Sequence, residues 1–563
     1  MAAAALPTSR RRSLAGEPGW KGLVRNRRIF AITVFTSLGG LIWGSYNQGV
    51  FGGVLGLCLF DVRLNHAFTR MASAVDNSVT KGWLVSILEL GAWFGSSYSL
   101  TTGYFADKIS RKYTIELAVI VFCIGVIVQT TAKGPQSIYG GRFVTGLGVG
   151  SISMAVPLYN AELAPPEVRG SLVALSQLAL AFGIMISFWI DYGTNFIGGS
   201  GATQSEASWR IPIALQLIPA LILGAGILFM PFSPRWLVNQ GRDDEALAVL
   251  SSARGLPSES ELVQIEFLEI KTQYLFEKET SAVKFPDYQD GSFSSNFKLG
   301  VYEYLSLFTN PTLFRRIMIG TLTMLFQQWT GVNAVLYYAP SIFKNLGLSG
   351  NATDLLATGV VGICMFLGMV PAVIYVDQVG RKPVLVFGAF LMGACHLTVA
   401  ILIGLFHNSF PSHVAAGWAA CSLLWVFAMA FGFSWGPCTW VIVAEIFPLR
   451  QVDVRGKGLS IAASSNWMNN FIVTPTMIQH LGFGTFVFFG VFSLMGGLFI
   501  MFFVPETKGV TLEEMEEVFG ATGHNLAVED QQRLDAIQRK IGLITKDNKS
   551  DSEEECRASD EKA

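Results

Sequence analysis

The chain is dominated by long apolar runs that short polar segments separate. Twelve runs can be marked, at about 29–56, 83–105, 113–132, 139–160, 171–193, 211–231, 313–343, 354–376, 382–406, 415–445, 457–478 and 483–504. Each is about 20 residues or longer, the length that a helix needs to cross a bilayer. Because backbone amides in lipid must be bonded within their own segment, each run is predicted to be a membrane-spanning helix.

Polar segments divide these runs into two sets of six. We predict a basic cytoplasmic tail at 1–28, a six-helix bundle at 29–231, a cytoplasmic linker with short helices at 232–312, a second six-helix bundle at 313–504 and an acidic cytoplasmic tail at 505–563 that is largely disordered at its end. In the linker, helices are expected at 243–254 and 259–280. The predicted fold class is an all-α membrane protein of twelve helices in two pseudo-symmetric six-helix bundles.

Charge and composition support a multi-pass membrane protein. Lys and Arg gather at the span ends on the side of the two tails and the linker, which places that side in the cytoplasm. Hydrophobic residues make up 51% of the chain and charged residues only 14%, against about 25% charged residues in soluble proteins. These values exclude an ordinary soluble enzyme, and a net charge of −1 gives no sign of a nucleic-acid partner.

The two halves repeat a charged signature at their span ends. GYFADKISRK carries Asp107 and Arg111, and YVDQVGRK repeats this pair as Asp377 and Arg381. Such internal repeats are typical of secondary transporters. We expect the charges to pair between the halves when the cytoplasmic side is closed, as a gate formed by Asp107, Arg111, Glu162, Arg169, Arg235, Asp377, Arg381, Glu445 and Arg455.

The spans also contain uncharged polar and aromatic side chains, which are costly in a bilayer and usually functional. Span 7 reads FQQWTGVNAVLYYAPSIF, and spans 5, 10 and 11 add further amides and tryptophans. This inventory suits a neutral polyhydroxyl ligand, whose hydroxyls must be bonded again when water is removed. The alternative is hydrogen bonding between helices. The candidates are Gln177, Gln327, Gln328, Asn333, Trp440 and Asn470. Asn466 and Trp467 lie in the same span as Asn470 and are further candidates.

No motif points to catalysis, a cofactor or a metal. The chain lacks a GxxxxGK[ST] loop, a dinucleotide fingerprint, an HExxH sequence and a CxxC pair. Only one histidine, His396, lies inside a span, and its position is typical of a packed polar residue rather than a ligand. We therefore expect neither an enzyme nor a bound cofactor.

Together these motifs resemble the sugar porter family of the major facilitator superfamily, and most of all its fungal monosaccharide transporters. The resemblance runs from about residue 29 to 520 and rests on GYFADKISRK, RFVTGLGVG, YNAELAPPEVRG, PFSPRW, FQQWTGVNAVLYYAPSIF, VDQVGRK, WGPCTWVIVAEIFPLR and VPETKG. It implies that a hexose or similar sugar is carried by alternating access. The family's sugar-binding amides and tryptophan fall on Gln177, Gln327, Gln328, Asn333, Asn470 and Trp440.

Some positions depart from the family pattern. Ser110 stands where a glycine is common, and Phe232 replaces a glutamate after span 6. Met365 falls near a sugar-contacting asparagine of some relatives, and Gly432 aligns with a glutamate of animal members. The resemblance therefore does not fix which sugar is preferred.

Energy coupling is a separate question. In proton-symporting members the position of Asn47 is typically Asp, near an arginine that corresponds to Arg142. An amide cannot titrate, which favours facilitated diffusion. Two acids remain inside spans, Glu89 and Asp191, and either offers a route to proton symport. The alternatives are a packing role for Glu89 and a wet helix end for Asp191.

The remaining expectations concern the cell. A transporter-like sugar sensor is the less favoured alternative, because such sensors tend to have long tails and the tail here is short. We expect a monomer in the plasma membrane, with a small neutral sugar and possibly protons as its partners. Asn351 opens a glycosylation sequon on the predicted outer side, close to the membrane.

Overall fold

The structure is a computed structural model. It describes residues 14, 26–40, 47, 49–51, 77–165, 169–199, 205–284, 293–346, 351–406, 409–447, 452–481, 483–508, 532–534 and 536–542. The predicted basic tail at 1–28 and the predicted disorder at the end of the acidic tail lie almost wholly outside the described residues. Four gate candidates belong to described helices, but their side chains lie outside the described part: Asp107, Arg169, Asp377 and Arg455.

Every element of regular structure among the described residues is a helix. The first half contains α3 (Arg27–Thr36), α4 (Leu38–Gly40), α7 (Asn77–Ile109), α8 (Arg111–Thr130), α9 (Pro135–Leu163), α10 (Arg169–Thr194), α11 (Ala207–Leu215) and α12 (Leu217–Ile227). The second contains α17 (Pro311–Trp329), α18 (Val332–Asn345), α19 (Asn351–Val379), α20 (Arg381–Phe406), α21 (Val414–Phe433), α22 (Trp435–Ile446), α23 (Val452–Leu481) and α24 (Phe483–Phe503).

These helices correspond to the twelve predicted spans. Pairs such as α11 with α12 and α17 with α18 are single spans with a local break. By length and hydropathy alone, seven of the described helical segments are apolar enough to cross a membrane. The broken span α17–α18 is not one of them, and it carries the amide-rich sequence.

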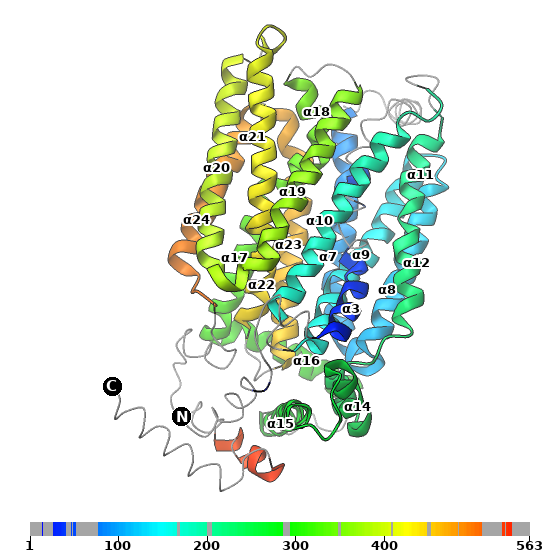
Figure 1. Ribbon diagram of the computed structural model, residues 1–563, viewed down its shortest axis with the longest axis vertical. Coiled ribbons are helices and arrows are strands. Elements are labelled where there is room, and N and C mark those ends of the chain that lie inside the picture. Colours follow the sequence, from blue (N-terminus) through cyan, green and yellow to red (C-terminus); the bar gives the residue numbers. More distant parts are fainter. Residues whose placement is uncertain are drawn as a thin grey trace.

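The two halves meet along two seams, α7 against α23 and α10 against α19, which stand between the groups in Figure 1. On the first seam the Ser97 and Ser464 hydroxyl oxygens are 3.1 Å apart, and Ser460 Oγ donates to the Ser96 carbonyl at 3.3 Å. These contacts lie in the part of the seam nearer the linker helices, so the halves are closed against each other on that side.

The linker forms a small helical unit below the bundles in Figure 1. It comprises α13 (Pro234–Asn239), α14 (Asp243–Arg254), α15 (Glu261–Lys284) and α16 (Phe293–Thr309), which confirms both helices predicted there. Trp236, Leu237 and Ala246 form its apolar core. The Arg254 Nε–H donates to Glu266 Oε2 at 3.0 Å and joins α14 to α15.

Candidate functional site

Span 7 is broken where its polar residues gather. Helix α17 ends at Trp329, Gly331 adopts φ 84°, and α18 begins at Val332. A positive φ favours glycine because it has no Cβ. A Cβ at Gly331 would also lie 2.5 Å from the Phe489 ring, so both backbone and packing require glycine there. The break separates two amides on α17 from a third on α18.

The amides on the two sides of the break are joined into one chain of hydrogen bonds. Asn466 of α23 donates through Nδ2 to Gln327 Oε1 at 2.6 Å and accepts through Oδ1 from Gln328 Nε2 at 2.9 Å. Gln328 Oε1 in turn accepts from Nδ2 of Asn333. All four side chains are at least nine-tenths buried. Hydroxyl groups of a ligand could exchange with these bonds without leaving an amide unsatisfied.

Gln327 is held more tightly than its neighbour. Its Nε2 lies 2.8 Å from the Trp435 carbonyl oxygen and 2.6 Å from Thr439 Oγ1, both on α22. Gln327 therefore ties span 7 to span 10 as well as facing the site. Part of the role of Gln327 is therefore to hold two helices together, which was the alternative to ligand binding for the polar residues of the spans.

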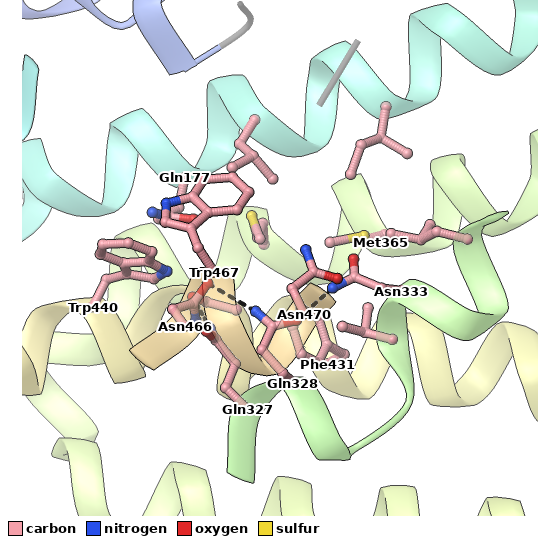
Figure 2. Close-up of a pocket in the computed structure, with 16 residues that line it drawn as sticks. Gln177, Gln327, Gln328, Asn333, Met365, Phe431, Trp440, Asn466, Trp467 and Asn470 are labelled. Atoms are coloured by element: carbon pink, nitrogen blue, oxygen red, sulfur yellow. Dashed lines mark hydrogen bonds between the residues drawn. The ribbon is translucent and has the colours of Figure 1, made fainter. Parts of the chain in front are cut away.

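These residues line one cavity between the halves (Figure 2). It contains all six predicted ligand-binding residues: Gln177, Gln327, Gln328, Asn333, Trp440 and Asn470. Among the residues of the first half that the structure describes, only those of α10 line it: Gln177, Leu180 and Ile184. Sequence reasoning did not assign Met369 and Phe431, which also line it, because single apolar residues in an apolar span carry no signal.

A second polar cluster lies across the halves. Tyr337 of α18 donates its hydroxyl to Glu89 Oε1 of α7 at 2.6 Å, and both side chains are almost fully buried. Nearby, Arg142 of α9 donates to the Asn47 side-chain oxygen at 3.4 Å and to the Val85 carbonyl at 3.1 Å. The arrangement connects the half-helix α18 of span 7 to the first half through the Glu89 carboxyl group.

The four coupling candidates are therefore not equivalent. Asn47, Arg142 and Glu89 lie on packed helices of the first half, and the guanidinium of Arg142 also lies 3.6 Å from the centre of the Phe51 ring. Asp191 is buried near the far end of α10, away from the linker. The wet helix end considered for it is not what the structure shows.

The span ends near the linker carry two ion pairs. Arg111 Nε lies 3.1 Å from Glu162 Oε1 in the first half, and an Arg381 nitrogen lies 2.8 Å from Glu445 Oε1 in the second. Each pair lies within one half. The sequence instead predicts that these charges pair between the halves. Arg235 forms no ion pair with another residue that the structure describes.

The fold and the site together define a class of protein: a membrane protein of two similar helical bundles with a polar, uncharged cavity between them. The family model "Sugar (and other) transporter" matches residues 32–519. A probable quinate permease of Aspergillus niger is 33% identical over 507 residues, covering 88% of each chain, and a quinate permease of Neurospora africana is 32% identical over 510 residues, covering 88% of this chain and 89% of the relative.

Solved structures agree with the sequence relatives. The proton:xylose symporter XylE bound to 6-bromo-6-deoxy-D-glucose has a TM-score of 0.70 at 28% identity, with 88% of this chain and 99% of that chain covered. The inward-open form of XylE from E. coli gives 0.64, with 87% and 99% covered. The chain belongs to the sugar porter family of transporters in the major facilitator superfamily, with its fold of twelve helices.

Proposed function

We propose that this transporter carries a monosaccharide, a hexose or a similar sugar, by alternating access, and binds it in the cavity beside the break in span 7. The observation that carries the proposal is the chain of amides from Gln327 through Asn466 and Gln328 to Asn333, which faces Gln177 of the other half. A ligand held by both halves links its own binding to their relative movement.

The charge of the cavity favours a neutral sugar over an acid. Of the described residues, sixteen line the cavity and none of these is charged. Transfer of an anion into such a site would leave its charge without a partner, which is strongly unfavourable. The relatives named as quinate permeases make a ring with a carboxylate the natural competitor, and a direct comparison of the two substrates separates the possibilities.

Uptake by cells that lack their own sugar transporters tests the proposal. We expect uptake of labelled glucose or xylose to exceed that of quinate. Gln328→Ala should raise the apparent transport constant, by about 1–3 kcal/mol for the partners left unsatisfied. Gln240→Ala, on the exposed linker surface, is the matched control. Normal sugar uptake by Gln328→Ala at equal surface expression would exclude this site.

The same cells and reconstituted liposomes separate a carrier from a sensor. A carrier produces flux in liposomes that contain no other protein, whereas a sensor binds sugar without flux. We also propose that the protein works as a monomer in the plasma membrane with both termini in the cytoplasm, and that Asn351 stays unmodified because of its nearness to the membrane.

The ion pairs near the linker are proposed to stabilise the state in which the cytoplasmic side is closed. Glu445 accepts from Arg381 at 2.8 Å and from the Thr507 hydroxyl at 2.6 Å, so it holds span 10 against spans 8–9 and the chain after span 12. Such bonds can form and break between two packed states without entering the bilayer core. The remaining members are Asp107, Arg169, Arg235, Asp377 and Arg455.

Proton symport is the second candidate, and the contact between Glu89 and Tyr337 favours it. A carboxyl group bonded across the halves can link the gain or loss of a proton to their separation. Against it, Asn47 occupies the place of the usual proton carrier beside Arg142, and for that reason we favour facilitated diffusion.

Proton coupling is tested by adding sugar to unbuffered cells. A facilitator gives no alkalinisation, and a protonophore does not change its final sugar level. If alkalinisation occurs, Glu89→Gln should abolish it while Asp191→Asn should not, because Glu89 is bonded to Tyr337 of α18 across the halves. Loss in the second variant alone would assign the proton to Asp191.

A further inference from the structure

The break in span 7 frees a backbone carbonyl that another helix takes up. In an unbroken helix the Thr330 carbonyl would accept from the amide of residue 334, but the turn at Gly331 interrupts the ladder. Instead, the Nε2 atom of His396, on α20, lies 2.9 Å from the Thr330 carbonyl oxygen. Helix breaks inside a membrane are tolerated where a neighbouring helix satisfies the freed backbone group.

The hydrogen bond also fixes the state of the imidazole ring. A carbonyl oxygen can only accept, so Nε2 must carry the hydrogen. The other nitrogen, Nδ1, is buried and has no hydrogen-bond partner among the described residues. His396 is fully buried, and its ring centre lies 4.2 Å from that of Phe427 and 5.9 Å from that of Phe489. The ring is thus a neutral donor held in an aromatic cage.

The aromatic rings around His396 also pack against the break in span 7. Phe489 is the ring that a Cβ at Gly331 would meet, so one phenylalanine packs against both the break and the histidine. The break in turn sets the distance between Gln328 on α17 and Asn333 on α18, which are bonded to each other across it. Any change in the angle between the half-helices changes the spacing of the two ligand-facing amides.

We infer that His396 is a positioning residue for the sugar site: it anchors the Thr330 carbonyl, and so fixes the angle at which α18 presents Asn333 opposite Gln328. The inference rests on the proposed function, since it assigns a role in sugar affinity. The inference also goes beyond the proposed function, because His396 does not line the cavity and would otherwise be only a packed polar residue.

Three substitutions separate anchoring from packing. His396→Phe keeps a flat ring but has no donor. His396→Gln places an amide nitrogen at the depth of Nε2, whereas His396→Asn is one bond too short to reach the carbonyl. His413→Phe, at the exposed connection before α21, is the matched control. The first readout, hydrogen–deuterium exchange of backbone amides at 330–338 in lipid nanodiscs, needs no sugar.

We expect His396→Phe and His396→Asn to exchange these amides about tenfold faster and to bind D-glucose or D-xylose about tenfold more weakly, the effect of one lost bond to a buried carbonyl. His396→Gln should stay near wild type in both, as should His413→Phe. Affinity is measured per folded molecule, so a purely structural role would lower the yield and leave affinity unchanged.

Three results would overturn the inference: wild-type exchange and affinity in His396→Phe, equal defects in His396→Gln and His396→Asn, or faster exchange without weaker binding. If His396→Phe cannot be purified folded, the Gln and Asn pair decides alone. If the wild-type protein binds neither sugar, the proposed function fails, while the exchange data still show whether His396 holds the hinge.

Discussion

The two halves share a skeleton but differ in chemistry. Among the described residues, the second half supplies nearly all polar groups of the cavity, through the amides of α17, α18 and α23, whereas the first contributes Gln177. The first half holds Glu89 and Arg142, two fully buried charged groups, and Glu89 is bonded to Tyr337 of α18 in the second half. We expect this duplicated fold to separate two tasks, ligand recognition in one bundle and, in the other, a charged contact to the half-helix α18.

The largest expected effect comes from the amides of the second half. Gln327 is bonded to α22 and to Asn466, so Gln327→Ala leaves several buried partners unsatisfied. We expect it to lower both thermal stability and sugar affinity, by about 1–3 kcal/mol. The thermal midpoint in detergent and the sugar dissociation constant measure the two effects.

Gln177→Ala is the matched change in the first half. The Gln177 side chain has no hydrogen bond to any residue that the structure describes, although it lines the cavity. Its loss should weaken sugar binding and leave the thermal midpoint of the sugar-free protein unchanged. A drop in stability equal to that of Gln327→Ala would show that the halves do not divide the work in this way.

The residues of the site could be predicted from the sequence, but the contacts that position them could not. The residue types and positions of Gln327, Gln328 and Asn333 were readable because polar groups stand out in an apolar span. The contact of Tyr337 with Glu89 was not, because it joins positions 248 residues apart. Likewise, His396 appeared only as a packed polar residue, since nothing in the sequence tells which carbonyl the break at Gly331 frees.

The same limit applies to the charged ends of the spans. Four of the expected gate residues form ion pairs, Arg111 with Glu162 and Arg381 with Glu445, but charge alone does not choose between partners within and between halves. The helix ends decide this, because Arg111 and Arg381 each begin the helix after a tight turn and reach the glutamate of their own bundle.

The two ion pairs predict a smaller, unequal effect. Glu445 accepts two described bonds, from Arg381 and Thr507, and Glu162 accepts one, from Arg111. Glu445→Gln should therefore lower the maximal transport rate more than Glu162→Gln, with a difference of about 1 kcal/mol in the closed state. Rates are compared at equal surface expression. Equal losses would mean that the pairs, although differently bonded, form one gate of symmetric strength.

The smallest effect is expected at the tight turns that precede those arginines. Gly380 has φ 102°, and the matching residue of the first half is Ser110, with φ 105°. This is the departure from glycine that the sequence showed, and it holds a serine in a backbone region that only glycine adopts easily. Ser110 has one compensating contact, since its Oγ accepts weakly from the Lys112 amide at 3.4 Å.

Ser110→Gly should therefore stabilise the protein slightly. Relief of an unfavourable backbone conformation contributes about 1–3 kcal/mol, while the greater freedom of glycine in the unfolded chain and the lost cap oppose it by about 1 kcal/mol together. Ser110→Ala keeps the Cβ and loses the cap, so it should destabilise. The thermal midpoints of the two variants should move in opposite directions from wild type. If both midpoints fall, the contact of Ser110 with Lys112 outweighs the strain. Serine then stabilises this turn more than glycine would.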